Sequence, residues 1–90
     1  MKVSQDAVLR KNPNAAYRIF DGKATVVLPD RSEVNVLNEV GSLVWERIDG
    51  VRTVAQIIQA VGEEYDIQSQ PVRDDILEFI GALHDHGMVN

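Results

Sequence analysis

The 90-residue chain contains no cysteine, so disulfides, thiolate metal sites and thiol nucleophiles are excluded. This composition fits a reducing compartment, and we expect a cytoplasmic protein. No apolar run approaches the ~20 residues of a membrane span, and the N-terminus lacks the apolar segment of a signal peptide, so no membrane association is expected. Acidic residues outnumber basic ones by 14 to 9, giving a net charge of −5. This balance leaves no surplus to neutralise phosphates and argues against nucleic acid as a partner.

The patterns of catalytic and metal-binding sites are also missing. His84 and His86 are the only histidines, and a spacing of two places them on different sides of a helix. The paired carboxylates Glu63-Glu64 and Asp74-Asp75 are adjacent residues and diverge in the same way. There is no glycine-rich phosphate loop and no Gly-x-Ser-x-Gly motif. The sequence therefore predicts no catalytic residue, no metal and no cofactor. A metal- or cofactor-dependent enzyme is kept as one of three hypotheses, and the other two are introduced below.

The first part of the chain is rich in strand-forming residues. Aromatic and β-branched residues in 17–20, 24–28 and 33–37 predict three short strands. Asp21-Gly22 predicts a two-residue hairpin turn, because both turn positions need a positive φ. Residues 29–32 contain Pro and Asp and predict a second turn. The third strand alternates polar and apolar residues, which predicts one buried face, and in such a meander the first and third strands are edges.

The second part of the chain carries helix signals. Asn38 is a candidate N-cap and Gly50 a candidate helix end, with apolar residues at helical spacing between them. Thr53 begins a capping-box pattern, which predicts a second helix. A third helix begins near Pro71, since proline is favoured in the first turn. We expect Trp45, the only tryptophan, to pack in the core beneath the sheet.

Strands grouped before helices indicate an α+β domain, with the helices packed on the sheet. A three-stranded antiparallel sheet followed by three helices also suits a winged helix-turn-helix architecture. We assign residues 15–90 to a single domain of this kind and residues 1–14 to an arm that is either mobile or a short strand. DNA binding is a common use of this architecture, so a transcription regulator is the alternative hypothesis. The third helix disfavours it, because its exposed side chains are acidic and only Arg73 is basic.

One strip of the third helix suggests a peptide groove. Leu77 lies outside the apolar core stripe and forms a second strip with Arg73, with Ile80 or Gly81, and with His84. An open edge of the third strand beside this strip would supply backbone N–H and C=O groups, and the strip would supply side-chain pockets. This arrangement adds an extended peptide as one more strand. A leucine that is simply half-buried explains Leu77 equally well.

An ordered set of short motifs runs through residues 17–90. They are Val36-Leu37-Asn38-Glu39-Val40-Gly41, Val44-Trp45-Glu46, Ile48-Asp49-Gly50, Arg52-Thr53-Val54, Ile57-Ile58, Tyr65-Asp66, Asp75-Ile76, Phe79-Ile80 and Gly87-Met88-Val89. Together they resemble the PqqD-like family. The founding branch of that family differs in the strand-to-helix segment and often lacks the tryptophan, so this chain is more similar to the broad superfamily.

The resemblance implies a winged-helix-like recognition element for ribosomally made, post-translationally modified peptides. Members bind the leader of a precursor peptide as an added strand between the third strand and the third helix. They present it to a modifying enzyme, often a radical S-adenosylmethionine protein, and are not catalysts. The founding member is a peptide chaperone in the biosynthesis of pyrroloquinoline quinone (PQQ). We therefore expect a leader-peptide-binding protein of PQQ biosynthesis or of a related pathway, and its open edge strand also permits a homodimer.

The expected peptide-binding residues lie on the third strand and the third helix. The strand would contribute its backbone groups, and the side chains of Val34, Val36 and the helix would line the groove. The full set is Glu33, Val34, Asn35, Val36, Leu37, Arg73, Leu77, Ile80 and His84.

Overall fold

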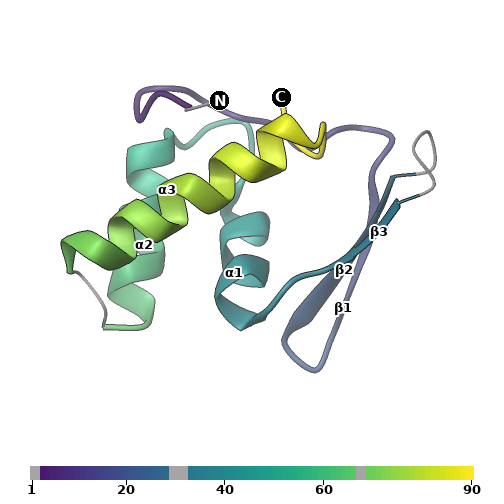
Figure 1. Ribbon diagram of the computed structural model, residues 1–90, viewed down its shortest axis with the longest axis horizontal. Helices are drawn as coiled ribbons and strands as arrows, with labels where there is room; N and C mark the ends of the chain where they lie inside the picture. The colour runs from purple at the N-terminus through teal and green to yellow at the C-terminus, as the bar shows by residue number, and fades with distance from the viewer. Residues whose placement is uncertain (1–2, 29–32, 67–68) are drawn as a thin grey trace.

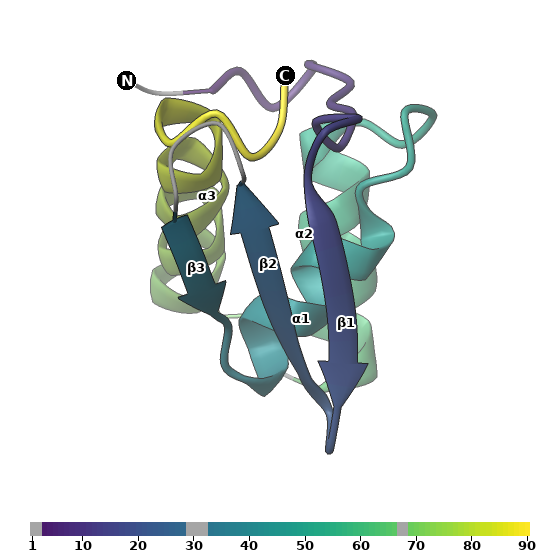
Figure 2. The same cartoon turned by 90° about the vertical axis from the view of Figure 1, so that its right-hand side faces the viewer.

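The structure, a computed structural model, describes residues 3–28, 33–66 and 69–90. Its elements are β1 (Ala16–Phe20), β2 (Lys23–Leu28), β3 (Glu33–Val36), α1 (Glu39–Arg47), α2 (Val54–Glu64) and α3 (Gln70–Asp85). Three strands therefore come first and three helices follow, as predicted (Figure 1). All three helices lie on the same side of the sheet, and no described element covers the other face (Figure 2). This is the expected α+β arrangement.

The sheet is an antiparallel meander in the order β1-β2-β3. Asp21 and Gly22 connect β1 to β2 with φ angles of 55° and 77°. A positive φ at both positions is the signature of a type I′ hairpin turn, so the predicted hairpin is confirmed. The predicted turn at 29–32 lies outside the described residues. Because β2 is central, β1 and β3 are the two edges of the sheet.

The helix starts follow the predicted capping residues. Asn38 Oδ1 accepts the backbone N–H of Gly41 at 2.7 Å, which caps α1. Thr53 and Gln56 exchange side-chain and backbone hydrogen bonds in a full capping box at the start of α2. Such caps satisfy backbone donors that a helix leaves unpaired in its first turn. They fix where α1 begins, which is three residues after the end of β3.

The loop between α1 and α2 is held by Asp49. Its Oδ1 accepts the backbone N–H groups of Arg52 and Val51, both at 2.9 Å, and its Oδ2 accepts from the Arg52 guanidinium at 2.8 Å. The hydrogen bond from the Arg52 amide, followed by that from Val51, lowers the pKa of Asp49 below its ordinary value of 3.8. Gly50 beside it has a φ of 79°, a conformation that glycine adopts without strain.

The core is centred on Trp45, which is fully buried as predicted. The ring of Tyr17 meets it edge-on, with ring centroids 5.4 Å apart. Lys11 Nζ lies 5.5 Å from the centroid of each ring and donates to the carbonyl oxygen of Ile48 at 2.7 Å. Partial burial lowers the pKa of Lys11. These contacts join the N-terminal arm, β1 and the end of α1.

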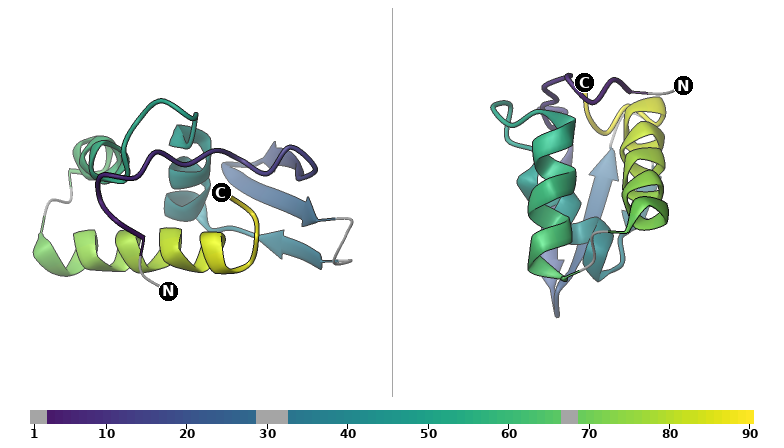
Figure 3. Two further views of the ribbon diagram at one scale, coloured as in Figure 1. Left: turned by 90° about the horizontal axis from the view of Figure 1, so that it is seen from above. Right: turned by 90° about the vertical axis from the view of Figure 1, so that its left-hand side faces the viewer.

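The N-terminal arm runs between α2 and the C-terminus (Figure 3). Val8 forms a single antiparallel bridge with Thr53, and Lys11 forms another with Val89. Arg10 exchanges two backbone hydrogen bonds with Asn90, at 2.8 and 2.9 Å. The C-terminal segment thus pairs with the arm through a single bridge at Val89. None of the helices in the described ranges is long and apolar enough to cross a lipid bilayer.

Candidate functional site

The alternation of β3 predicts one buried face, and the structure shows that this face does not carry the valines. Val34 and Val36 are 65% and 70% exposed. Asn35 pairs with the buried Val26 and therefore points toward the helices. Leu37, the residue after the strand, is buried, and its N–H donates to the carbonyl oxygen of Ala24 at 2.8 Å. Because side chains alternate with a period of two, burial of Leu37 turns both valines outward.

A buried hydroxyl fixes this register. Ser42 of α1 accepts the N–H of Ala24 on its Oγ at 2.6 Å. The same hydroxyl donates to the carbonyl oxygen of Leu37 at 3.3 Å. It thus replaces one bond of the β2–β3 ladder and ties both strands to α1. Ser42 is among the buried residues, and such a satisfied polar group specifies one arrangement, because a shifted register would leave it unpaired.

The open edge of β3 exposes the backbone groups of two residues. In an antiparallel pair, residues that bond to the neighbouring strand alternate with residues that face away. The bond from Leu37 to Ala24 sets this alternation, so Asn35 bonds to β2. The N–H and C=O groups of Val34 and Val36 therefore point away from the sheet. They form a short row of donors and acceptors at the edge.

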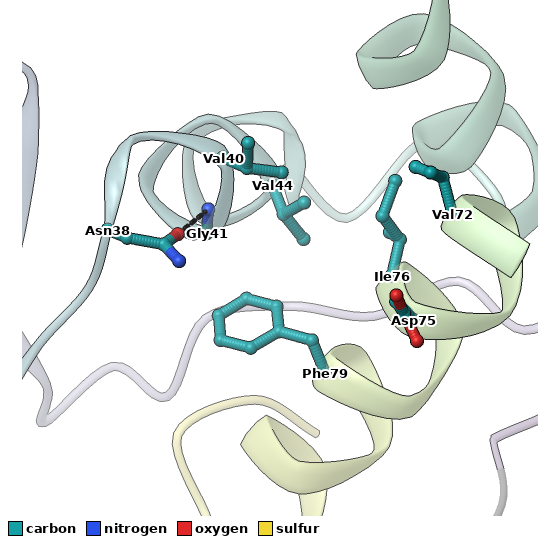
Figure 4. Close-up of a pocket in the computed structure, with 8 residues that line it drawn as sticks. All are labelled: Asn38, Val40, Gly41, Val44, Val72, Asp75, Ile76 and Phe79. Carbon is teal, nitrogen blue, oxygen red and sulfur yellow. Dashed lines mark hydrogen bonds between the residues drawn. The ribbon is translucent and has the colours of Figure 1, made fainter. Parts of the chain in front are cut away.

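A hollow between α1 and α3 lies next to the end of this edge. It has a volume of about 240 Å³. Asn38, two residues after Val36, lines its rim. The Phe79 side chain of α3 extends across it toward α1 (Figure 4), where a Cβ on Gly41 would lie 3.0 Å from the ring. The lining residues are Asn38, Val40, Gly41, Val44, Val72, Asp75, Ile76 and Phe79.

The hollow is apolar except at its rim. Asp75 is the one ionisable group in its lining, and Asn38 Oδ1 is already engaged by the Gly41 amide. On the edge strand, the side-chain Nδ2 of Asn35 is buried without a hydrogen-bond partner among the described residues. A buried donor of this kind is costly unless a partner arrives. The site therefore combines backbone groups at an edge, an apolar hollow and one spare amide.

The predicted residues of α3 do not line this hollow. Arg73 donates to the Gln59 side chain of α2 at 3.1 Å. Leu77 and His84 follow at helical spacing on the same side of α3, while Ile80 is fully buried. The wall toward α1 is instead formed by Val72, Asp75, Ile76 and Phe79. One sequence signal for this wall is Gly41 of α1, because a glycine there leaves space for the bulky Phe79 side chain.

The described residues hold no group of three or more His, Cys, Asp or Glu side chains placed to bind a metal ion. His84 and His86 lie at the C-terminal end of α3. The Nδ1 atom of His84 is buried and has no hydrogen-bond partner within the described part of the chain. This single histidine nitrogen does not make a candidate metal centre.

The order of three strands and three helices defines a small α+β domain compatible with a winged helix-turn-helix description. A family model described as "Coenzyme PQQ synthesis protein D (PqqD)" matches residues 24–89. The chain belongs to the PqqD family. This confirms the family indicated by the sequence motifs.

Curated relatives of the chain come from Xanthomonas. One from Xanthomonas oryzae pv. oryzae (strain PXO99A) is 33% identical over 75 residues, covering 83% of this chain and 79% of the relative. One from Xanthomonas euvesicatoria pv. vesicatoria (strain 85-10) is 32% identical over 59 residues, covering 66% and 62%. Both are named "PqqA binding protein". The second match thus spans about three fifths of that relative.

Two solved structures share the fold. The chain described as "TbiB1 in Complex with the TbiA(beta) Leader Peptide" superposes with a TM-score of 0.79 at 18% identity, covering 90% of this chain and 94% of that one. "Lasso peptide synthetase B1 complexed with the leader peptide" gives 0.78 at 21% identity, covering 93% and 99%. At such low identity the likeness establishes the three-strand, three-helix architecture.

Proposed function

We propose that this chain is a non-catalytic peptide-binding protein that acts in the cytoplasm. It binds the leader of a ribosomally made precursor peptide as a fourth strand on β3 and presents the peptide to a modifying enzyme. The observation that carries the proposal is the open edge at Val34 and Val36 ending beside the hollow at Phe79. The proposal is also supported by relatives named for PqqA binding and by structural neighbours complexed with leader peptides.

The binding mode follows from strand geometry. The leader backbone pairs with the outward N–H and C=O groups of Val34 and Val36, which gives affinity that depends little on sequence. Alternate leader side chains then face the helices. Those side chains meet the spare amide of Asn35 and the apolar hollow at Phe79. An aliphatic side chain fully buried there contributes about 1.5–3 kcal/mol, so the hollow sets much of the preference among leaders.

The sequence-derived residues divide under this proposal. Within residues 33–37, the outward backbone groups of Val34 and Val36 remain the pairing edge. On α3, Val72 and Phe79 take over the role expected of Arg73 and Leu77, because they form the wall that faces the hollow.

The partners proposed here are those that the family resemblance implies. The modifying enzyme is a radical S-adenosylmethionine protein of PQQ biosynthesis or of a related pathway. Binding the leader raises the local concentration of the precursor at the enzyme and requires no catalytic group on this chain. Without a leader, the same edge can pair with a second copy of the chain, so the homodimer is a resting form.

A pair of variants on α3 tests the proposed groove. The leader probe is a fluorescently labelled PqqA peptide, chosen because curated relatives are named for binding PqqA. Phe79→Ser removes the apolar wall of the hollow, and Leu77→Ser is the matched control on the α2 side of the same helix. We expect at least tenfold weaker binding for Phe79→Ser and less than twofold change for Leu77→Ser, measured by fluorescence polarisation. The reverse order of effects would move the site to the other side of α3.

A further inference from the structure

The uncovered face of the sheet is mostly apolar, with two basic residues. It carries the outward side chains of all three strands and is called the outer face; its described residues are Ala16, Arg18, Phe20, Lys23, Thr25, Val27, Val34 and Val36. Phe20 is 81% exposed, and β1 and β2 form a shallow hollow of about 430 Å³. The described helices all lie behind the sheet when this face is viewed (Figure 2).

The residues of the outer face are not those expected of a sheet face that contacts only water. An antiparallel sheet with one solvated face usually places polar residues on that face. Here Val34 and Val36 point outward while Asn35 points inward, so β3 exposes its apolar side. Contiguous exposed apolar residues of this kind mark interaction surfaces. The outer face therefore has the character of a surface that is covered in the working state.

Charge distinguishes between possible partners. Arg18 and Lys23 are the ionisable residues at the described outward positions, and none of those positions holds a carboxylate. The chain as a whole carries a net charge of −5, so this face is a basic area on an acidic protein. A second copy docking face to face would bring like charges together, which is unfavourable. A partner with an apolar surface edged by carboxylates fits it.

The outer face is also continuous with the leader site. A leader strand added to β3 would extend the sheet by one strand, and alternate leader side chains would lie beside Val34 and Val36 on the outer face. We infer that the outer face docks the modifying enzyme, which then contacts the sheet and the outward side chains of the bound leader together. This inference rests on the proposed function. Such joint contact would let the enzyme distinguish the loaded from the empty protein.

Two outer-face variants and one control test this docking surface. Phe20→Ser and Arg18→Glu change β1, the edge far from the leader site, while Val51→Ser changes a valine that is 78% exposed in the α1–α2 loop. The probes are the labelled leader peptide and the purified radical S-adenosylmethionine enzyme proposed above as the partner. Enzyme binding to the leader-loaded protein is followed by biolayer interferometry.

We expect Phe20→Ser and Arg18→Glu to weaken enzyme binding at least tenfold, with leader affinity within twofold of wild type and Val51→Ser unchanged in both assays. Unchanged enzyme binding in both β1 variants would overturn the inference. So would a monomer–dimer shift caused by Phe20→Ser in sedimentation, because the face would then belong to a second copy. Arg18→Glu keeps the test decisive if Phe20→Ser alters the fold. Failure of the proposed function is distinct, since wild-type protein would then not bind the leader.

Discussion

Replacing Val34 by proline removes one backbone donor from the open edge of β3. The Val34 N–H points away from β2, so the ladder between β2 and β3 keeps its hydrogen bonds. Proline is tolerated in an edge strand when its missing N–H faces outward. The variant is therefore expected to fold and to lose a group that matters only when a leader strand is added.

The size of the effect follows from the exposure of the edge. The Val34 side chain is 65% exposed, so water can reach the leader carbonyl that loses its donor. The loss is then the net value of one hydrogen bond, about 0.5–1.5 kcal/mol, and not the larger penalty of a buried unpaired group. This corresponds to a roughly two- to twelvefold rise in Kd for the leader.

The assay is fluorescence polarisation with the labelled leader peptide, and two variants serve as controls. Val34→Ala removes the side chain and keeps the N–H, so its Kd is expected to stay within about twofold. Ile19→Pro removes an outward N–H from β1 by the same alternation of the ladder. It tests the other edge and is expected to leave leader affinity unchanged. Circular dichroism and thermal unfolding confirm that each variant is folded.

An unchanged Kd in folded Val34→Pro would refute pairing at β3. A loss of affinity in Ile19→Pro alone would place the leader on β1. Equal losses in Val34→Pro and Val34→Ala would mean that the side chain contributes to binding and the backbone does not.

Three further predictions test the site and its support. Gly41→Ala places a Cβ about 3.0 Å from the Phe79 ring, so calorimetry with the leader peptide should show several-fold weaker binding in a protein that remains folded. Trp45→Ala removes a fully buried aromatic side chain and should lower the free energy of unfolding in urea by about 3–5 kcal/mol. The pKa of Asp49 is depressed in the folded protein, so its contribution to stability is present above the ordinary carboxyl pKa and is lost as pH falls through the folded value. Urea unfolding between about pH 5 and about pH 2 should therefore show a weaker pH dependence for Asp49→Asn, and equal slopes would contradict this account.

Local sequence signals predicted where strands and helices begin and end. The turn at Asp21-Gly22 and the caps at Asn38 and Thr53 depend on residues within four positions of one another. Such interactions can be read from a sequence because their geometry is set by the chain itself. The same holds for burial of Trp45, since an aromatic residue beside an apolar helical stripe has few other places in a small domain.

Tertiary contacts determine which faces of β3 and α3 are buried, and local sequence patterns do not. Which alternate residues of β3 face the helices depends on burial of Leu37 and on the two hydrogen bonds of the Ser42 hydroxyl. These hydrogen bonds join segments that are distant in sequence. Helical spacing on α3 gives two candidate sides, and it does not say which side faces α1. Packing of Arg73 against Gln59 assigns one side to α2 and leaves Phe79 for the hollow. The strand and the helix were thus predicted correctly as elements, and which side of the helix contacts the leader stays a prediction.

The central claim is that a leader peptide pairs with the open edge of β3. Residue-resolved amide hydrogen exchange tests it most directly, because the amides of Val34 and Val36 face solvent while that of Asn35 bonds to β2. In the free protein, diluted until it is monomeric, Val34 and Val36 should exchange quickly and Asn35 slowly. Saturating leader peptide should slow amide exchange at Val34 and Val36. It should leave exchange unchanged at Tyr17 and Ile19, whose amides face the open edge of β1. Fast exchange at both valines in the saturated complex would contradict the account.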